Sequence, residues 1–283
     1  FLHYKTLIII TTVVFLTVSS LTAIFIPNKY TSSALLAPSA VEDNFSNQIS
    51  SFSSIANMAG INLDNPSTNK SNEAIERIKS YDFFVAYFLP NVKYENLVAA
   101  KKWNIADNMI SYNRRIYNKS SDTWVRNKTP KKPSKQEAFE EYLEILQISE
   151  DNKTKFISIQ IEHPSPVVAE SWLKLIIKSI NNYMADIDES IAKDSLEFLN
   201  TSIQNINFSE VKKSVNSLIE KQIQILTFIE ANEDYVFKAI SSPIAPEKKS
   251  SPARIIIILT GTILGFISSL LLSLFLNYKN KFQ

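Results

Sequence analysis

Few residues of this chain have the types and the spacing that chemistry requires. Its two histidines, His3 and His163, lie far apart in the sequence, so neither is expected to form a triad or a zinc site with a second histidine. His163 follows an expected strand and fits a turn residue better than a catalyst. The neighbouring acids Asp186, Asp188 and Glu189 lie around the surface of an expected helix, as a solvated face would. No catalytic pair is therefore predicted.

The composition excludes further kinds of chemistry. There is no cysteine, which excludes disulfides and thiol-ligated metal sites. Gly60 stands alone in the polar part of the chain, whereas a phosphate-binding loop needs clustered glycines. All 28 acidic residues and all but three of the 30 basic ones (Lys5, Lys279 and Lys281) lie between 28 and 254, so no strong field attracts nucleic acid. We therefore expect no enzyme, no cofactor, no metal and no nucleic-acid partner.

Two stretches have side chains that could bind a sugar or an acidic group. Trp103, Tyr112, Tyr117 and Trp124 could stack on sugars, although packing against a sheet with the spacing of a buried helix is the simpler interpretation. The basic segment 126–135 is broken by prolines. It could contact acidic sugars or lipid headgroups, but a solvated loop is again simpler.

Two apolar runs bracket the polar part of the chain. The run 255–276 carries no charge and would be about 33 Å long as a helix, enough to cross a hydrocarbon core of about 30 Å. The run 7–26 ends before Pro27. It is longer than the core of a signal peptide and no cleavage site follows it, so a retained span is expected. The first residue is Phe1, and the natural start is expected to lie upstream.

These runs divide the chain into five parts: a tail at 1–6, a transmembrane helix at 7–26, a polar domain at 27–254, a second transmembrane helix at 255–276 and a tail at 277–283. Two spans place both tails on the same side of the membrane. The Lys and Arg residues near the span ends do not favour either side.

Hydrophobic periodicity predicts an α+β domain. Strands are expected at 30–36, 156–161 and 235–240, with a turn at 151–153. Helices are expected at 46–59 and 71–89, one or two more over 94–117, and a helix running into a strand over 136–148, while 60–70 is expected to be a loop.

Apolar residues that recur every three or four positions predict a long helical hairpin or a kinked helix after Pro166. The interruption falls at 205–209, where Ser209 is the expected N-cap of the second helix. This helical projection, at about 167–232, would reach roughly 40 Å or more.

The segment before the second span resembles a family signature. Pro243, Pro246, Ser251 and Pro252 fall at the spacing found in the Wzz chain-length determinants, also called polysaccharide co-polymerases. The segment after the first span is also similar to that family's: Pro27, Tyr30, Ser32, Ala34, Leu36 and Pro38.

The signature departs from the family pattern at two positions. Ala253 stands where the family usually has a basic residue, although Arg254 follows at once, and Ser269 stands where a second glycine is expected after Gly265. The strand at 156–161 and the long helix resemble the core of the family's periplasmic domain, and the segment 103–124 is similar to a subgroup.

The resemblance implies an inner-membrane protein of bacteria with cytoplasmic tails and a periplasmic α/β base that carries a long extended helical hairpin. It also implies a ring-shaped homo-oligomer that sets the modal length of a surface polysaccharide such as O-antigen. The implied partners are a Wzy-type polymerase, a polysaccharide or lipid-linked glycan, and membrane lipid. The chain ends seven residues after the second span without a P-loop or a tyrosine-rich tail, so no kinase is expected.

The candidate interface with the membrane, a second subunit or the polymerase comprises Pro27, Tyr30, Pro243, Pro246, Ser251, Pro252, Arg254, Gly261 and Gly265. The two glycines form a small-xxx-small pattern, which permits close helix contact with the first span, a neighbouring subunit or the polymerase, or is merely tolerated in a span. Two other functions stay open: an accessory protein of capsule or exopolysaccharide export, and a two-span extracytoplasmic sensor. Tails without a signalling domain argue against the sensor.

Overall fold

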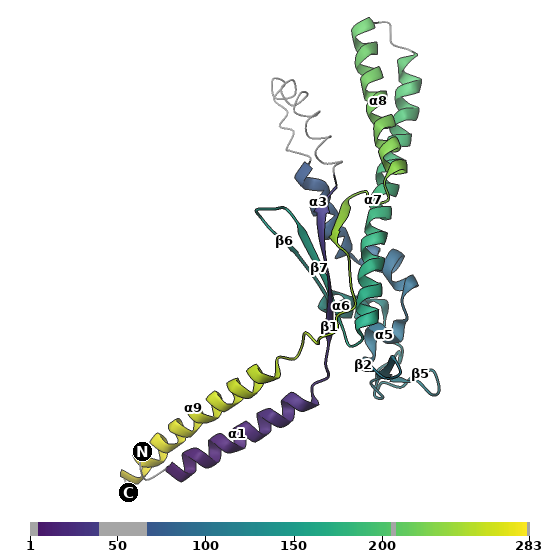
Figure 1. Cartoon of the computed structure of the whole chain (residues 1–283). Coiled ribbons are helices and arrows are strands. Elements are labelled where there is room, and N and C mark those ends of the chain that lie inside the picture. The colour runs from purple at the N-terminus through teal and green to yellow at the C-terminus, as the bar shows by residue number, and fades with distance from the viewer. Residues whose placement is uncertain (1–4, 40–66, 205–207, 282–283) are drawn as a thin grey trace.

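The computed structural model describes residues 5–39, 67–204 and 208–281 (Figure 1). Two apolar helices from the ends of the chain extend away from a domain of mixed helix and sheet, and a helical hairpin projects from the other end of that domain. The expected α+β class is therefore confirmed. The expected helix at 46–59 and most of the expected loop at 60–70 lie outside the described residues.

Four antiparallel strands form the main sheet, in the order β6–β7–β1–β8. Their bounds are β1 Tyr30–Pro38, β6 Leu146–Glu150, β7 Ile157–His163 and β8 Phe237–Ser241. Alternating residues build one buried face, on which Ala34 of β1 lies opposite Ile159 of β7. The strands expected at 30–36, 156–161 and 235–240 are confirmed. So is the helix that runs into a strand, because α6 (Lys135–Ile145) leads directly into β6.

A 38-residue helix, α7 (Pro166–Ile203), links the sheet to the projection and is about 57 Å long. The buried residues of its first half pack on the sheet: Ala169, Trp172, Leu173, Ile176, Ile180 and Met184. Its second half pairs with α8 (Ser209–Ala231) as a helical hairpin (Figure 1). The prediction of Ser209 as N-cap is wrong, because Ser209 already lies inside α8 and Phe208 is the capping position.

A buried amide fixes the return of the chain from the hairpin to the sheet. The side-chain oxygen of Asn181 accepts the backbone N–H groups of Val236 and Phe237 at 2.8 and 2.9 Å. Its amide nitrogen donates to the Phe237 carbonyl at 3.0 Å. These three bonds satisfy backbone groups that are buried where β8 begins, and so they hold β8 against α7.

The prediction of one or two helices over 94–117 is wrong. Only α5 (Tyr94–Val98) is helical, and two hairpins follow it. These hairpins pair β2 (Ala100–Asn104) with β3 (Met109–Tyr112), and β4 (Tyr117–Asn118) with β5 (Thr123–Trp124). Asn108 and Asp122 take φ values of 50° and 52°, which Asn and Asp tolerate better than most residues, and so they turn the chain back.

The helix expected at 71–89 is divided into short pieces. They are α3 (Ser67–Ile78), α4 (Tyr81–Phe83), the π-helical turn η2 (Phe84–Phe88) and the 3₁₀ turn η3 (Leu89–Asn91). The Ser80 hydroxyl accepts the Phe83 N–H at 3.2 Å, and this cap starts a new helix after α3. Phe84 and Phe88 of the π turn are then both buried beside Tyr142 of α6.

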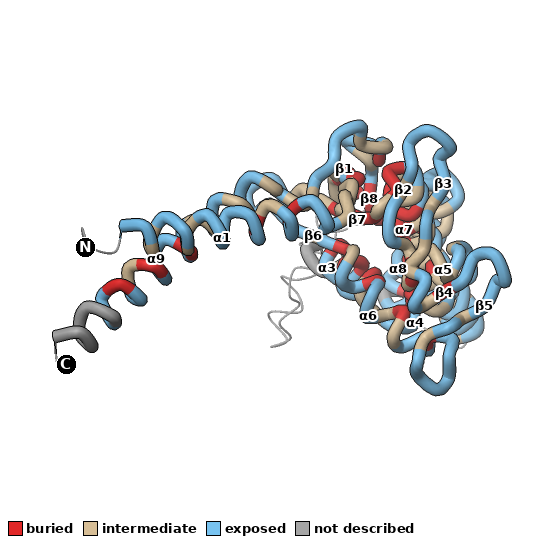
Figure 2. Tube along the Cα trace, turned by 90° about the horizontal axis from the view of Figure 1, so that it is seen from below, coloured by how far each residue is buried: buried red, intermediate tan, exposed pale blue. Residues whose placement is uncertain are grey.

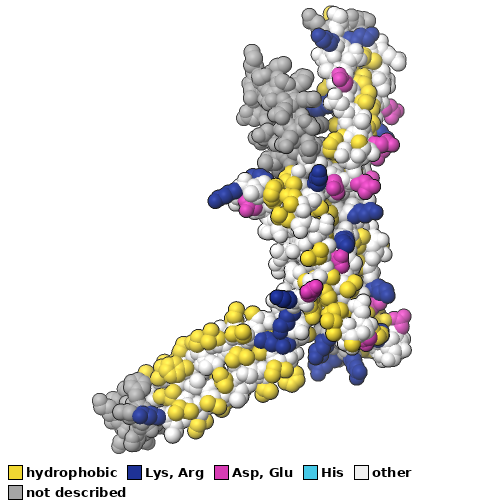
Figure 3. Space-filling model, in the orientation of Figure 1, with side chains coloured by type: hydrophobic (Ala, Val, Ile, Leu, Met, Phe, Trp, Pro, Cys, Tyr) yellow, Lys and Arg dark blue, Asp and Glu magenta, His cyan; other side chains and the backbone are white. Residues whose placement is uncertain are grey.

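The helices at the chain ends, α1 (Lys5–Phe25) and α9 (Arg254–Lys281), lie side by side (Figures 1 and 2). Both are long and apolar enough to cross a membrane by length and composition. Their side chains are mostly exposed, and Figure 3 shows hydrophobic groups spread over the pair. An apolar surface of this extent has no place in water, which is consistent with two membrane spans.

Candidate functional site at the helix–domain junction

The two apolar helices join the domain through one set of contacts, which we call the junction and define as residues 26–32 and 243–254. The Lys29 N–H donates to the Ser251 carbonyl at 3.0 Å, and the Ser250 N–H donates to the Lys29 carbonyl at 2.9 Å. The Ser32 hydroxyl donates to the Ile244 carbonyl at 2.8 Å. The segment that follows α1 and the segment that precedes α9 are therefore hydrogen-bonded to each other next to the two helices.

The prolines of the family signature lie in both chain segments of the junction. Pro27 follows α1, Pro252 precedes α9, and Pro243 and Pro246 lie in the stretch between β8 and Ser251. A proline fixes its own φ and has no N–H to donate. These four prolines therefore limit the backbone hydrogen bonds of the junction to the few positions between them. They also restrict the backbone conformations available to the two segments.

Gly261 and Gly265 lie on the face of α9 that contacts α1. A Cβ added to Gly261 would lie 2.4 Å from the Ser19 Cβ, and one added to Gly265 would lie 2.5 Å from the Phe15 Cβ. The same face continues at four-residue steps with two buried serines, Ser269 and Ser273. The position where the family signature has a second glycine thus still carries a small residue, and small residues let two helix backbones approach closely.

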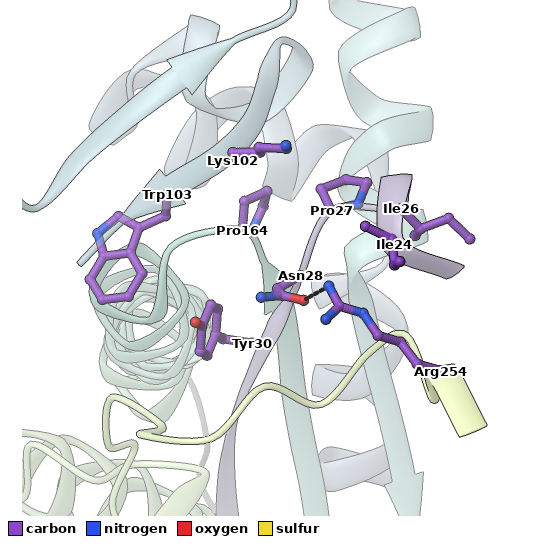
Figure 4. A pocket seen from close by; sticks show the side chains of 9 residues that line it. All are labelled: Ile24, Ile26, Pro27, Asn28, Tyr30, Lys102, Trp103, Pro164 and Arg254. Atoms are coloured by element: carbon purple, nitrogen blue, oxygen red, sulfur yellow. Dashed lines mark hydrogen bonds between the residues drawn. The ribbon is translucent and has the colours of Figure 1, made fainter. Parts of the chain in front are cut away.

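A pocket of about 150 Å³ opens beside the junction (Figure 4). Its walls come from the end of α1, the start of β1, strand β2 and the start of α9. The Arg254 guanidinium donates to the Asn28 side-chain oxygen at 3.0 Å, the dashed line in Figure 4. On the opposite wall the Tyr30 and Trp103 rings meet edge to face, with centroids 5.6 Å apart. Of the candidate residues, the pocket brings together Pro27, Tyr30 and Arg254.

Three residues of this region are missing from the sequence interpretation: Asn28, Lys102 and Glu162. Lys102 lines the pocket, and Glu162 forms an ion pair with Lys29 at 3.1 Å. Asn28 meets Arg254 across 226 positions of sequence, for which no local signal exists. The turn residues that follow Lys102 are a signal that could have revealed its hairpin, because Asn and Asp gather there.

The four aromatic residues set aside as a sugar platform lie on the hairpins and not on a helix. Tyr117 packs against both Tyr112 and Trp124, with centroid distances of 5.3 and 5.1 Å, and Trp103 packs on Tyr30. Packing against other side chains thus accounts for all four, although not through the helical spacing that was expected.

The basic segment 126–135 is organised by one arginine. Arg126 forms an ion pair with Glu137 at 2.6 Å and donates to the carbonyls of Pro130, Lys131 and Lys132. This bonding holds the pKa of Glu137 down at about 2, chiefly through the Arg126 hydrogen bond and then through the Ser134 N–H. The guanidinium is therefore engaged in shaping its own loop.

The acids grouped at 186–189 have separate structural partners. Asp188 accepts from Lys70 and from the Tyr235 hydroxyl, which links α3, α7 and the chain before β8. Glu189 pairs with Lys193 one turn further along α7. Across the residues that the structure describes, no three His, Cys, Asp or Glu side chains come together as a metal site would require.

His163 is buried at the end of β7, directly opposite Tyr30 of β1. Its Nδ1 accepts the Ser165 N–H at 3.0 Å, so Nε2 carries the proton and donates to the Asn96 carbonyl at 3.0 Å. Burial lowers the pKa of His163 to about 4, although the Asn96 and Ser165 carbonyls lie within reach of the ring nitrogens and would raise it by accepting from the charged ring. The ring is thus a neutral structural group that ties α5 and the start of α7 to the sheet.

The fold and the junction together define a class of protein: a domain of mixed helix and sheet carried on two terminal apolar helices. Residues 1–88 match the model of the Wzz family, described as chain length determinant protein. The resemblance to that family is confirmed by this match. The two apolar helices and the match fit an inner-membrane protein with a periplasmic domain.

The solved structures that are similar to this chain include two polysaccharide co-polymerases. One is a full-length bacterial polysaccharide co-polymerase, 14% identical, with 99% of this chain and 96% of that chain covered and a TM-score of 0.41. The other is a fragment of WzzB, a polysaccharide co-polymerase from Salmonella Typhimurium, 16% identical, with 79% of this chain and 100% of that chain covered and a TM-score of 0.36. No curated protein sequence matches the chain.

The buried His163 predicts how the stability of the domain depends on pH. Its folded-state pKa of about 4 lies below the ordinary value of 6.5, so the unfolded chain takes up a proton first as the pH falls. The contribution of His163 is fully present above pH 6.5 and is lost between pH 6.5 and about 4, by roughly 3 kcal/mol.

Urea unfolding of the detergent-solubilised chain at pH 7 and at pH 4.5 measures this loss. His163→Gln keeps a donor for the Asn96 carbonyl but does not titrate. The difference in the free energy of unfolding between pH 7 and pH 4.5 should therefore be smaller in this variant, by most of the roughly 3 kcal/mol that His163 contributes. An equal pH dependence in His163→Gln and in the unaltered chain would contradict the assignment.

Proposed function

We propose that this protein sets the chain length of a bacterial surface polysaccharide, O-antigen or a related glycan, as an oligomer acting with a Wzy-type polymerase in the inner membrane. The observation that carries the proposal is the match of residues 1–88 to the chain length determinant family. Those residues include α1, β1 and the Lys29 side of the junction. The matched part therefore includes the first of the two segments that tie the domain to the apolar helices.

The proposed mechanism is geometric and not catalytic. The junction holds the domain on its two membrane helices, and the α7–α8 hairpin extends in the opposite direction (Figure 1). An oligomer of such chains would hold the growing glycan or its polymerase, and the hairpin would bias the point at which elongation stops. In this proposal the junction residues and the glycine face of α9 form the interface with the membrane, a neighbouring subunit or the polymerase.

Exposed apolar side chains on the hairpin support the oligomer. Phe198 of α7 is 70% exposed and Phe208, just before α8, is 76% exposed. Further exposed apolar residues of the hairpin are Ile191, Val211, Leu218 and Ile223. Side chains of this size are costly to leave in water, and contact with copies of the same hairpin would cover them.

Deletion of the gene, followed by gel separation of the surface polysaccharide, tests the proposed function. We expect polymer of dispersed length without a modal cluster of bands, and we expect the cluster to return with a plasmid copy of the gene. Loss of all surface polymer would contradict length control and indicate a role in export. An unchanged profile would also contradict it and would favour a sensor.

We call the face of α9 that carries Gly261 and Gly265 the glycine face. Replacing both glycines with Leu tests whether α9 acts through its contact with α1. A Leu side chain at Gly261 or Gly265 cannot fit against Ser19 or Phe15 at the present spacing, so the two helices must move apart. The Gly261→Leu/Gly265→Leu variant should still insert in the membrane but should shift or broaden the modal cluster. Ser268→Leu is the matched control, because Ser268 is exposed on the same helix and has room for the side chain.

The glycine experiment requires two readouts. Membrane fractionation shows that the double variant inserts, and gel separation of the polysaccharide shows the modal length. If the double variant and Ser268→Leu both gave the modal length and the oligomer size of the unaltered chain, the glycine face would have no part in length control.

A further inference from the structure

The pocket beside the junction takes no part in the pairing of Lys29 with Ser251, and its chemistry differs from that of the surfaces around it. Two of its residues are cationic, Lys102 of β2 and Arg254 at the start of α9. Figure 4 shows the two side chains on different walls of the same space. None of the nine residues that line it is acidic.

The charge of Arg254 is not balanced by a carboxylate in the described part of the chain. Its guanidinium donates to the neutral Asn28 side chain, and no carboxylate of the described residues forms an ion pair with it. Its Nε is buried and has no acceptor among the described residues. A buried guanidinium donor without an acceptor costs free energy. Arg254 therefore has a donor for which the described residues supply no acceptor.

Lys102 is exposed and likewise forms no ion pair with a described residue. By contrast, Lys29 at the same junction is paired with Glu162. Both cations that line the pocket thus lack a carboxylate partner among the described residues, and their charge can attract a ligand of negative charge.

The other lining residues place the pocket at the edge of the membrane. Ile24 lies at the end of α1 and Ile26 just after it. They are 66% and 42% exposed, so they continue the apolar surface of the helix up to the cations. Tyr30 and Trp103 form the opposite wall, and these two residue types are enriched where a membrane meets water. Figure 3 shows Lys and Arg side chains gathered where the terminal helices meet the domain.

We propose that this pocket binds the phosphate of a membrane lipid, with Arg254 and Lys102 as the phosphate-binding residues and Ile24 and Ile26 in contact with its hydrocarbon chains. A phosphate supplies the charge and the hydrogen-bond acceptors that the two cations need. A ligand that is anionic at one end and apolar at the other matches both sets of lining residues, which a free phosphate ion does not. The proposal rests on the membrane location of α1 and α9 but not on length control.

Native mass spectrometry of the full chain in dodecylmaltoside, titrated with dioctanoyl phosphatidylglycerol, measures lipid bound per chain. We expect saturable binding of one lipid per chain. Arg254→Gln should weaken it about tenfold and Lys102→Gln about fivefold, because each variant loses charge-assisted hydrogen bonds to the phosphate. The matched controls are Lys101→Gln on the same strand and Lys249→Gln on the same segment as Arg254; neither lines the pocket, and both should bind within about twofold of the unaltered chain.

A second variant separates loss of the site from loss of the junction. Asn28→Ala removes the hydrogen bond to Arg254 but keeps both cations. Because Asn28 lines the pocket and holds Arg254, binding should weaken, but by less than in Arg254→Gln, which removes the charge itself. If Asn28→Ala and Arg254→Gln weakened binding equally, the effect of Arg254 would be structural and the proposal would be wrong.

Three further ligands identify what is bound. Dioctanoylglycerol, which has the same chains without phosphate, should bind at least tenfold more weakly, and equal binding would mean an apolar contact only. Inorganic phosphate should not displace the lipid at equal concentration; displacement would indicate a site for the free ion and would overturn the proposal. Farnesyl phosphate distinguishes a polyprenyl lipid from a glycerophospholipid, and tight binding of either supports a lipid phosphate.

The outcome is independent of the polysaccharide profile. A chain that binds phosphatidylglycerol through Arg254 but does not alter polysaccharide length would contradict the proposed function and leave the lipid site in place. A chain that controls length but binds no lipid phosphate would contradict the lipid site and leave the proposed function in place.

Discussion

Backbone hydrogen bonds between Lys29 and the pair Ser250–Ser251 join two segments of chain that are 221 positions apart in the sequence. They lie where both apolar helices join the described sheet. Because β1 begins at the next residue and lies between β7 and β8, the pairing connects α1 and α9 to the middle of the sheet. The domain is therefore held on two helices that act together, and not on a single flexible tether.

The packing of α1 on α9 extends this constraint along the two helices. Small residues at four-residue steps on α9 bring its backbone close to Ser19 and Phe15 of α1, and the prolines beside each helix restrict the chain that enters it. A displacement of the helices in the membrane would thus reach β1 and, through the sheet, α7 and the hairpin. In the proposed function, this connection is the means by which events at the membrane helices and at the hairpin affect each other.

The sequence predicted those parts of the fold whose signal is local. Ile157, Ile159 and Ile161 alternate and form a strand, and the long apolar stripe after Pro166 forms α7. The apolar residues of 94–117 also fit helical spacing, but after α5 the region forms hairpins, because turn residues such as Asn108 reverse the chain. The pocket could not be predicted at all, because Lys102 and Arg254 are brought together only by the tertiary fold.

Disulfide cross-linking across the junction tests the central claim most directly, since the chain has no cysteine of its own. Lys29 and Ser251 form a hydrogen-bonded antiparallel pair. The Cα atoms of such a pair are about 5.5 Å apart, which is within the range of a disulfide. In native membranes treated with copper phenanthroline, Lys29→Cys/Ser251→Cys should form an intramolecular disulfide, seen as a faster band on a non-reducing gel, and should keep the modal polysaccharide length. The control Lys29→Cys/Lys248→Cys should cross-link far less. Equal cross-linking of both pairs, or cross-links only between chains, would contradict a fixed junction.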